Sequence, residues 1–172
     1  RGGDIFAYAK ARGDVGEQRY TLATNWRSVP ALISAVNAVF LGREAPFVYD
    51  DIIEFQAVLP ASKPHAPLRH NGQEAKALTF WQFGIDQNTR PIGKSALEQT
   101  ISNAVADEIA SLVLGGRKTE SCLGDIPLVS GDIAVLVRTS YEGNRVRQAL
   151  QARGIGAVSV GRDTVFESAE AQ

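Results

Sequence analysis

The spacing of apolar residues along the first part of the chain predicts two helices with a short strand between them. Residues 4–12 open with an aspartate, a suitable N-cap, and continue with apolar residues on one side of a helix. Residues 19–23 predict a short strand. Ser28 can cap a second helix that runs to about Leu41, and Gly42 follows where a C-cap is expected. The apolar positions of this helix are Leu32, Ile33, Val36, Val39 and Phe40.

The middle of the chain alternates between irregular and regular patterns. Residues 43–72 contain four prolines and alternate imperfectly, which predicts a long irregular excursion. Residues 77–83 are aromatic and typical of a strand. Ser95 and Glu98 have the spacing of a capping box, and apolar residues at helical spacing follow them as far as the glycine pair 115–116. We therefore expect a long helix from Ser95 to that pair.

The last part of the chain has the pattern of a βαβ unit. Residues 133–137 form a continuous apolar run, typical of a strand covered on both faces, and 142–153 and 157–160 predict a helix and another strand. Ligands of such sheets bind beyond the carboxyl ends of the strands. Arg27 and Arg138 both follow predicted strands, so we expect one rim of a mostly parallel sheet to present both.

Composition and charge restrict the classes of protein that fit. The chain has 172 residues, 44% hydrophobic and 22% charged, which fits one domain with a continuous core. No apolar run approaches the ~18 residues of a membrane span, and the single cysteine excludes an internal disulfide, as expected in the cytoplasm. A net charge of -1 argues against a surface that grips nucleic acid everywhere. Because the chain contains no methionine, we expect an internal segment of a longer protein.

Residues 25–28 carry the clearest candidate chemistry. Arg27 has a planar guanidinium that can donate two hydrogen bonds to one phosphate, and Trp26 offers a flat face to a base. The chain has no GxxxxGK[ST] loop of its own to cradle phosphates. We therefore expect a shared site, in which residues outside this chain hold the phosphates and this chain supplies Arg27 as an arginine finger.

Each of these residues also has a purely structural interpretation. Arg27 can pair with a carboxylate beside its helix, and Trp26 can pack in a core or between lobes. Arg138 can cap the strand before it or pair with a surface acid. His65 and His70 have no partner at metal-ligand spacing, and we expect no metal site.

Four blocks in order resemble the superfamily 1 DNA helicases of the UvrD and Rep type, and within them the RecB family, the beta subunits of exodeoxyribonuclease V. The blocks are residues 1–4, 20–28, 131–150 and 163–172. They are similar to the end of the third helicase motif, the fourth motif, a strand and helix of the second motor lobe, and the start of that lobe's helical insertion. Trp26, residues 46–55 and residues 162–166 are the features that favour the RecB family.

The resemblance implies roles for six residues. Arg27 would reach the γ-phosphate of ATP, with Trp26 on or near the adenine and Asn25 beside them. Arg138 and Ser140 would contact single-stranded DNA, although many relatives carry asparagine where Ser140 stands. Arg1 borders the family's strand-stacking loop.

The resemblance also implies a fold, cofactors and partners. The chain would be the N-terminal part of a three-layer RecA-like α/β second motor lobe, incomplete at its C-terminal side. ATP and Mg²⁺ would be held mainly by a first lobe outside the chain, so the chain alone would be inactive. Single- and double-stranded DNA and the subunits RecC and RecD are the implied partners. An open sheet edge would favour self-association of the isolated chain, which sedimentation would reveal.

Two other functions fit the residues less well. The first is a catalytically silent α/β module that docks DNA or partner subunits. In such a module we would expect Trp26 and Arg27 to be buried. A doubly wound nucleotide-binding protein would need a glycine-rich turn after a strand, and none is present.

Overall fold

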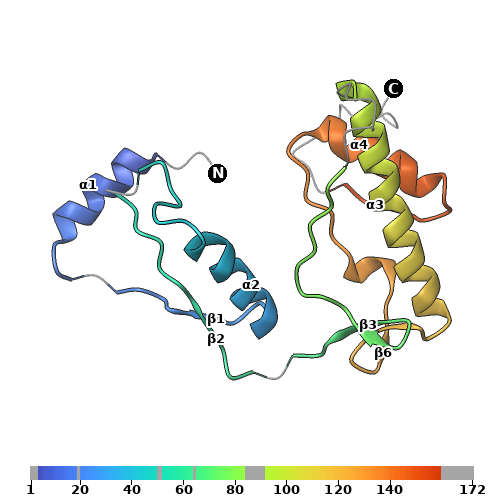
Figure 1. Ribbon diagram of the computed structural model, residues 1–172, viewed down its shortest axis with the longest axis horizontal. Coiled ribbons are helices and arrows are strands. Elements are labelled where there is room, and N and C mark those ends of the chain that lie inside the picture. Colours follow the sequence, from blue (N-terminus) through green and yellow to red (C-terminus); the bar gives the residue numbers. More distant parts are fainter. Residues whose placement is uncertain (1–3, 19, 50–51, 64, 84–91, 160–172) are drawn as a thin grey trace. The chain divides into compact units, whose positions relative to one another are not determined.

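The chain contains two compact units, which are described separately. The computed structural model describes residues 4–18, 20–49, 52–63, 65–83 and 92–159 (Figure 1). Unit 1 comprises Arg1–His65 and Lys76–Phe80, and unit 2 comprises Ala66–Ala75 and Trp81–Gln172. Both contain helices and short strands, so the chain is of the α/β class.

Unit 1 begins with helix α1 (Ile5–Val15), which confirms the predicted helix start. The Asp4 carboxylate accepts a hydrogen bond from the N–H of Phe6 at 2.9 Å, as an N-cap should. The helix extends beyond the predicted end to Val15, and the chain then turns at Gly16, whose φ of 61° suits glycine.

The strand predicted at 19–23 is wrong, because the strand of this region begins later in the chain. Strand β1 is Thr24–Asn25, which pairs in parallel with β2 (Leu59–Pro60). Residues 20–23 lie before this ladder, and Leu22 is 94% exposed. The carbonyl of Ala23 accepts from the N–H of Leu59 at 2.8 Å, so only the last residue of the predicted segment contributes a hydrogen bond to this ladder.

Helix α2 (Pro30–Leu41) has the predicted end, but a different residue caps its start. The N-cap is Val29 and makes no side-chain hydrogen bond, so the predicted Ser28 cap is wrong. The N–H of Ser28 instead donates to Asn25 Oδ1 at 3.0 Å. Pro30 occupies the first helical position, where its missing N–H costs nothing.

An aromatic cluster holds α2 against the segment that follows it. The rings of Phe40 and Phe55 are stacked with centroids 4.8 Å apart, and Phe47 lies 5.6 Å from Phe40. Such pairs add to the hydrophobic stabilisation of a packed core. The irregular chain after α2 is therefore packed against the helix although it contains little secondary structure.

Unit 2 is organised around helix α3 (Lys94–Arg117). Its N-cap is Gly93, with no side-chain hydrogen bond, so the predicted Ser95 capping box is wrong. Glu98 lies instead within ion-pair distance of Lys94 and Arg145, 3.9 Å from each. The helix also passes through the glycine pair 115–116, where the sequence predicted its end.

A small antiparallel sheet packs at the end of α3. Its order is β4-β3-β5-β6, with β3 at Leu68–His70, β4 at Gln73–Glu74, β5 at Ser121–Leu123 and β6 at Ile126–Pro127. The β3–β4 turn uses Asn71 and Gly72, whose φ values of 52° and 75° are those of a two-residue hairpin. The strand predicted at 77–83 does not form, since these residues join neither sheet.

Helix α4 (Ser140–Gln151) packs on α3 and completes the core of unit 2. Thr139 and Glu142 form a capping box, so the helix begins earlier than predicted. The core unites apolar residues of both helices and of the segment after α4: Ala106, Ile109, Val113, Val146, Ala149, Leu150 and Ile155.

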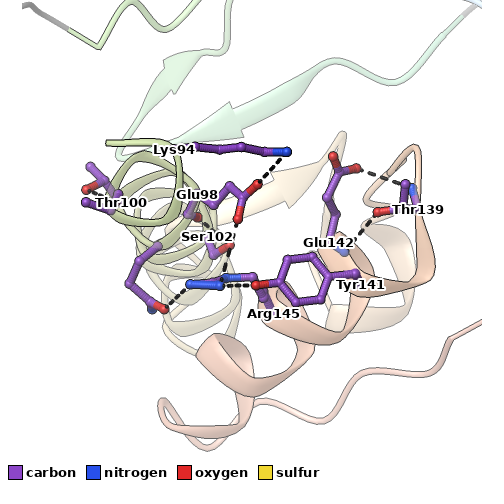
Figure 2. A network of polar contacts seen from close by, with 10 residues as sticks. Lys94, Glu98, Thr100, Ser102, Thr139, Tyr141, Glu142 and Arg145 are labelled. Atoms are coloured by element: carbon purple, nitrogen blue, oxygen red, sulfur yellow. Dashed lines mark hydrogen bonds and ion pairs between the residues drawn. The ribbon is translucent and has the colours of Figure 1, made fainter. Parts of the chain in front are cut away.

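Polar contacts join the same two helices at their exposed side. Figure 2 shows Arg145 of α4 beside Glu98 of α3 and donating to Tyr141 Oη at 2.6 Å. At the other end of the interface, Arg153 donates to Asp107 at 2.7 Å, and this hydrogen bond holds the pKa of the Asp107 carboxyl below its usual value. The α3–α4 interface is thus apolar at its centre and polar at its rim.

The strand predicted at 133–137 is not formed, nor is the described part (157–159) of the strand predicted at 157–160, so the predicted βαβ unit is wrong for the residues described. Ile133 has an extended backbone, but residues 133–137 and 157–159 pair with no strand in the described part of the chain. Leu136 is 96% exposed rather than covered on both faces. The described sheets are mixed, with one parallel pair and antiparallel pairing elsewhere, instead of mostly parallel.

Candidate functional site

The loop from Asn25 to Ser28 forms the candidate site of unit 1. It leaves the end of β1 and leads through Val29 into α2. Asn25 Oδ1 accepts hydrogen bonds from the N–H of Arg27 at 2.9 Å and from the N–H of Ser28 at 3.0 Å. This is an Asx turn, in which a short side chain takes the place of a backbone acceptor.

The loop exposes both residues predicted to contact a nucleotide. Trp26 is 66% exposed, and Arg27 is also exposed. An open hollow of about 330 Å³ lies beside them and is lined by Leu22, Thr24, Asn25, Trp26, Arg27 and Val58. A hollow whose lining includes apolar side chains, an indole ring and a guanidinium can receive a base and an anionic group.

Among the described residues, Trp26 and Arg27 do not have the structural partners considered above. Within residues 4–159, leaving out the undescribed positions, no carboxylate lies within 4.0 Å of the Arg27 guanidinium. Trp26 is too exposed to be a core residue. Both side chains are therefore available to a ligand or to another part of the protein.

The residues predicted to contact DNA lie in unit 2. Arg138 is exposed and comes just before the N-cap of α4, and its N–H donates to Glu142 Oε2 at 2.9 Å. Ser140 is the first residue of α4 and is exposed. Glu142 thus fixes the backbone at Arg138 while the guanidinium remains accessible.

The predicted common rim for Arg27 and Arg138 stays a prediction, because the two arginines belong to different units. Arg1 and residues 163–172 lie outside the described residues. In the described part of the chain, no group of three or more His, Cys, Asp and Glu side chains is placed to hold a metal. Among the helices described, none combines the length and apolarity that a membrane crossing requires.

Asn37 is a residue of this region that the sequence analysis did not single out. Its Nδ2 donates to the carbonyl of Val58 at 2.9 Å, and its Oδ1 accepts from the N–H of the same residue at 3.3 Å. This pair ties α2 to the chain that leads into β2. In the sequence, this role could have been suspected from one asparagine that stands among the apolar positions of a predicted helix.

His70 has a structural partner that the sequence did not predict. Its Nδ1 lies 2.6 Å from Oγ of Ser121, which is completely buried, and its Nε2 lies 3.1 Å from Nδ2 of Asn71. No carboxylate takes part, and the buried hydroxyl is closed to a substrate. These contacts join strands β3 and β5 rather than form a catalytic pair.

Sequence comparison relates the whole chain to one group of proteins. RecBCD enzyme subunit RecB of Escherichia coli K12 is 36% identical over the full chain, which spans 15% of that protein. The same subunit of Mycobacterium tuberculosis CDC 1551 is 32% identical with the same coverage, and that of Haemophilus influenzae Rd is 30% identical over 98% of the chain. No protein-family model matches the chain. The resemblance found in its motifs is thereby confirmed: along its whole length the chain is similar to RecB subunits, and it corresponds to a segment of about 15% of their length.

Proposed function

We propose that the chain is part of a RecB-type, ATP-dependent DNA helicase and exonuclease subunit that acts in double-strand break repair and recombination. The observation that carries this proposal is the match along the whole chain to relatives named as RecBCD enzyme subunits, together with an exposed arginine and tryptophan on one loop. The assembly name of the relatives favours RecC and RecD as partners, with DNA as the substrate, in the cytoplasm. Because the chain spans 15% of those relatives, we expect no ATP hydrolysis or DNA cleavage from it alone.

Arg27 is the proposed arginine finger of this subunit. ATP and Mg²⁺ would be held mainly by a first motor lobe, and Arg27 would donate to the γ-phosphate across the cleft between lobes. A guanidinium suits this role because it stays charged and can donate two parallel hydrogen bonds. Its exposure and lack of a carboxylate partner among the described residues support the assignment. The direct test is the kinetics of an Arg27 variant in the full-length protein.

The exposed apolar run at 133–137, which pairs with no strand in the described part of the chain, supports a place in a larger RecA-like sheet. Residues 133–137 are apolar and carry Val135, Leu136 and Val137 in exposed positions. A soluble protein rarely leaves such a run exposed unless another element covers it. We propose that these residues become an inner strand of the second motor lobe when the rest of the protein is present.

Replacing Trp26 by alanine in the full-length protein should raise the KM for ATP by about tenfold, because stacking of a base on an aromatic ring contributes about 1–3 kcal/mol. The kcat should change much less, since the ring contacts the base and not the transferred phosphate. Steady-state ATPase kinetics in the presence of single-stranded DNA would measure both constants. Trp26→Tyr, which keeps an aromatic face, serves as the control, and an unchanged KM in the alanine variant would remove the adenine role.

Replacing Arg138 by alanine should weaken binding of single-stranded DNA on the order of tenfold and lower the salt dependence of that binding. The effect should be similar for different base sequences, because a phosphate contact carries no sequence information. Titration of the full-length protein with a labelled oligonucleotide at several salt concentrations would show it. Arg147→Ala, which removes an exposed arginine of the helix that follows Arg138, is the matched control. Equal effects of the two substitutions would argue against a specific contact by Arg138.

A further inference from the structure

The side-chain amide of Asn25 is hydrogen-bonded to the backbone of the loop that carries Arg27. Both of its partners, the backbone N–H groups of Arg27 and Ser28, are donors, at 2.9 Å and 3.0 Å. The atom that faces them is therefore the amide oxygen, because the nitrogen has no capacity to accept. Asn25 acts on this loop as an acceptor.

The backbone of Asn25 is anchored on its other side to the sheet of unit 1. Its carbonyl accepts from the N–H of Ala61 at 3.1 Å, and Ala61 is 4% exposed. Asn25 also ends β1 and is paired in register with Pro60. The residue thus connects a buried, hydrogen-bonded part of unit 1 to the exposed loop.

The far end of the loop is held by different contacts. Asn37 ties α2 to Val58 through two hydrogen bonds. Residues 26–28 lie between β1 and α2. In the described part of the chain, the side-chain hydrogen bonds found for them are the two that Asn25 Oδ1 accepts from the N–H groups of Arg27 and Ser28. The direction in which Trp26 and Arg27 leave the backbone therefore depends on a single acceptor oxygen.

We propose that Asn25 is a positioning residue for Arg27. The proposal rests on the finger role proposed for Arg27. By closing the Asx turn, Asn25 sets the backbone at Arg27 so that its guanidinium is presented to the γ-phosphate. Positioning of this kind has large effects, because a displacement of about 1 Å at a reacting group can reduce a rate about 100-fold.

A pair of substitutions separates the acceptor from the rest of the side chain. Alanine and serine at position 25 both lack the amide donor, but serine keeps an oxygen that can accept from the same N–H groups. In the full-length protein with single-stranded DNA, Asn25→Ala should lower the kcat of ATP hydrolysis by about 100-fold with little change in the KM for ATP. Asn25→Ser should retain kcat to within about tenfold of the unsubstituted protein. Equal losses in the two variants would overturn the positioning role.

A further variant tests whether the place of the acceptor oxygen matters. Asn25→Gln keeps both the donor and the acceptor but moves the oxygen by one methylene, so it should lower kcat although the chemical groups are retained. Full activity of this variant would contradict the proposal, because it would show that the place of the oxygen is unimportant.

The double variant distinguishes this inference from the proposed function. If Asn25 acts through Arg27, Asn25→Ala combined with Arg27→Ala should be no slower than Arg27→Ala alone. Losses that multiply would show that Asn25 contributes separately, and would overturn the positioning role while leaving the finger intact. An unchanged kcat in Arg27→Ala alone would instead overturn the finger, and the role of Asn25 with it.

Discussion

Replacing Arg27 by alanine in the full-length protein should lower the kcat of DNA-stimulated ATP hydrolysis by a factor of about a thousand or more, with ATP binding largely retained. An arginine finger acts on the charge that spreads over the transferred phosphoryl group, and that charge is greatest in the transition state. Removing it therefore costs more in rate than in affinity for the ground-state nucleotide. Steady-state kinetics and equilibrium binding of a fluorescent ATP analogue would measure the two effects separately.

Two variants sharpen this expectation. Arg27→Lys should also lose most of its kcat, because an ammonium lacks the planar fork that donates two parallel hydrogen bonds. Arg43→Ala removes another exposed arginine of unit 1 and should leave kcat unchanged. If the Arg27→Ala variant hydrolyses ATP at the normal rate, or if only its KM for ATP rises, the arginine-finger role of Arg27 is excluded. The silent docking module would then be the better interpretation.

The helices could be predicted well because their signals are local. The end of α2 at Leu41 follows from a run of apolar residues that stops before Gly42, and the first turn of α1 follows from Asp4. These features depend on residues a few positions apart, which the sequence displays directly. The caps of α2 and α3 were less predictable, because Ser28 and Glu98 found other partners in the folded chain.

The strands were predicted poorly because a strand depends on partners that are remote in sequence. Residues 133–137 have the composition of an inner strand, but no neighbouring strand pairs with them in the described part of the chain. The β3–β4 hairpin had a usable signal in the dipeptide Asn71–Gly72, which favours the left-handed backbone of a two-residue turn. That signal was hidden within a proline-rich region.

For the candidate site, the sequence predicted the reactive groups but not what holds them. The exposure of Trp26 and Arg27 agrees with an aromatic residue and an arginine placed before a helix. Asn25 was predicted to lie at the nucleotide, which stays a prediction, and the structure adds that its side-chain oxygen binds the backbone of the loop. Asparagine is found in both roles, and only the positions of its neighbours in space distinguish them.

Replacing Gly116 by alanine should destabilise unit 2 by about 3 kcal/mol, at the upper end of the cost of overpacking. A Cβ atom at this position would overlap the carbonyl oxygen of Leu128 and lie 2.9 Å from its carbonyl carbon. Leu128 is 4% exposed, and its N–H donates to Ser121 of β5, so its backbone cannot move aside without disturbing the sheet. This close approach explains why a residue without a Cβ atom stands at this position of α3.

Gly143→Ala in α4 is the matched control for this substitution. A Cβ there would meet Val137 at 3.4 Å, an ordinary contact, and alanine favours a helix over glycine by about 1 kcal/mol. The control should therefore be neutral or slightly stabilising, whereas Gly116→Ala should lower the urea midpoint of the chain. In the full-length protein, Gly116→Ala should also speed amide hydrogen exchange at the end of α3. Equal stability of the two variants would mean that α3 and the segment at Leu128 are not packed as closely as the structure shows.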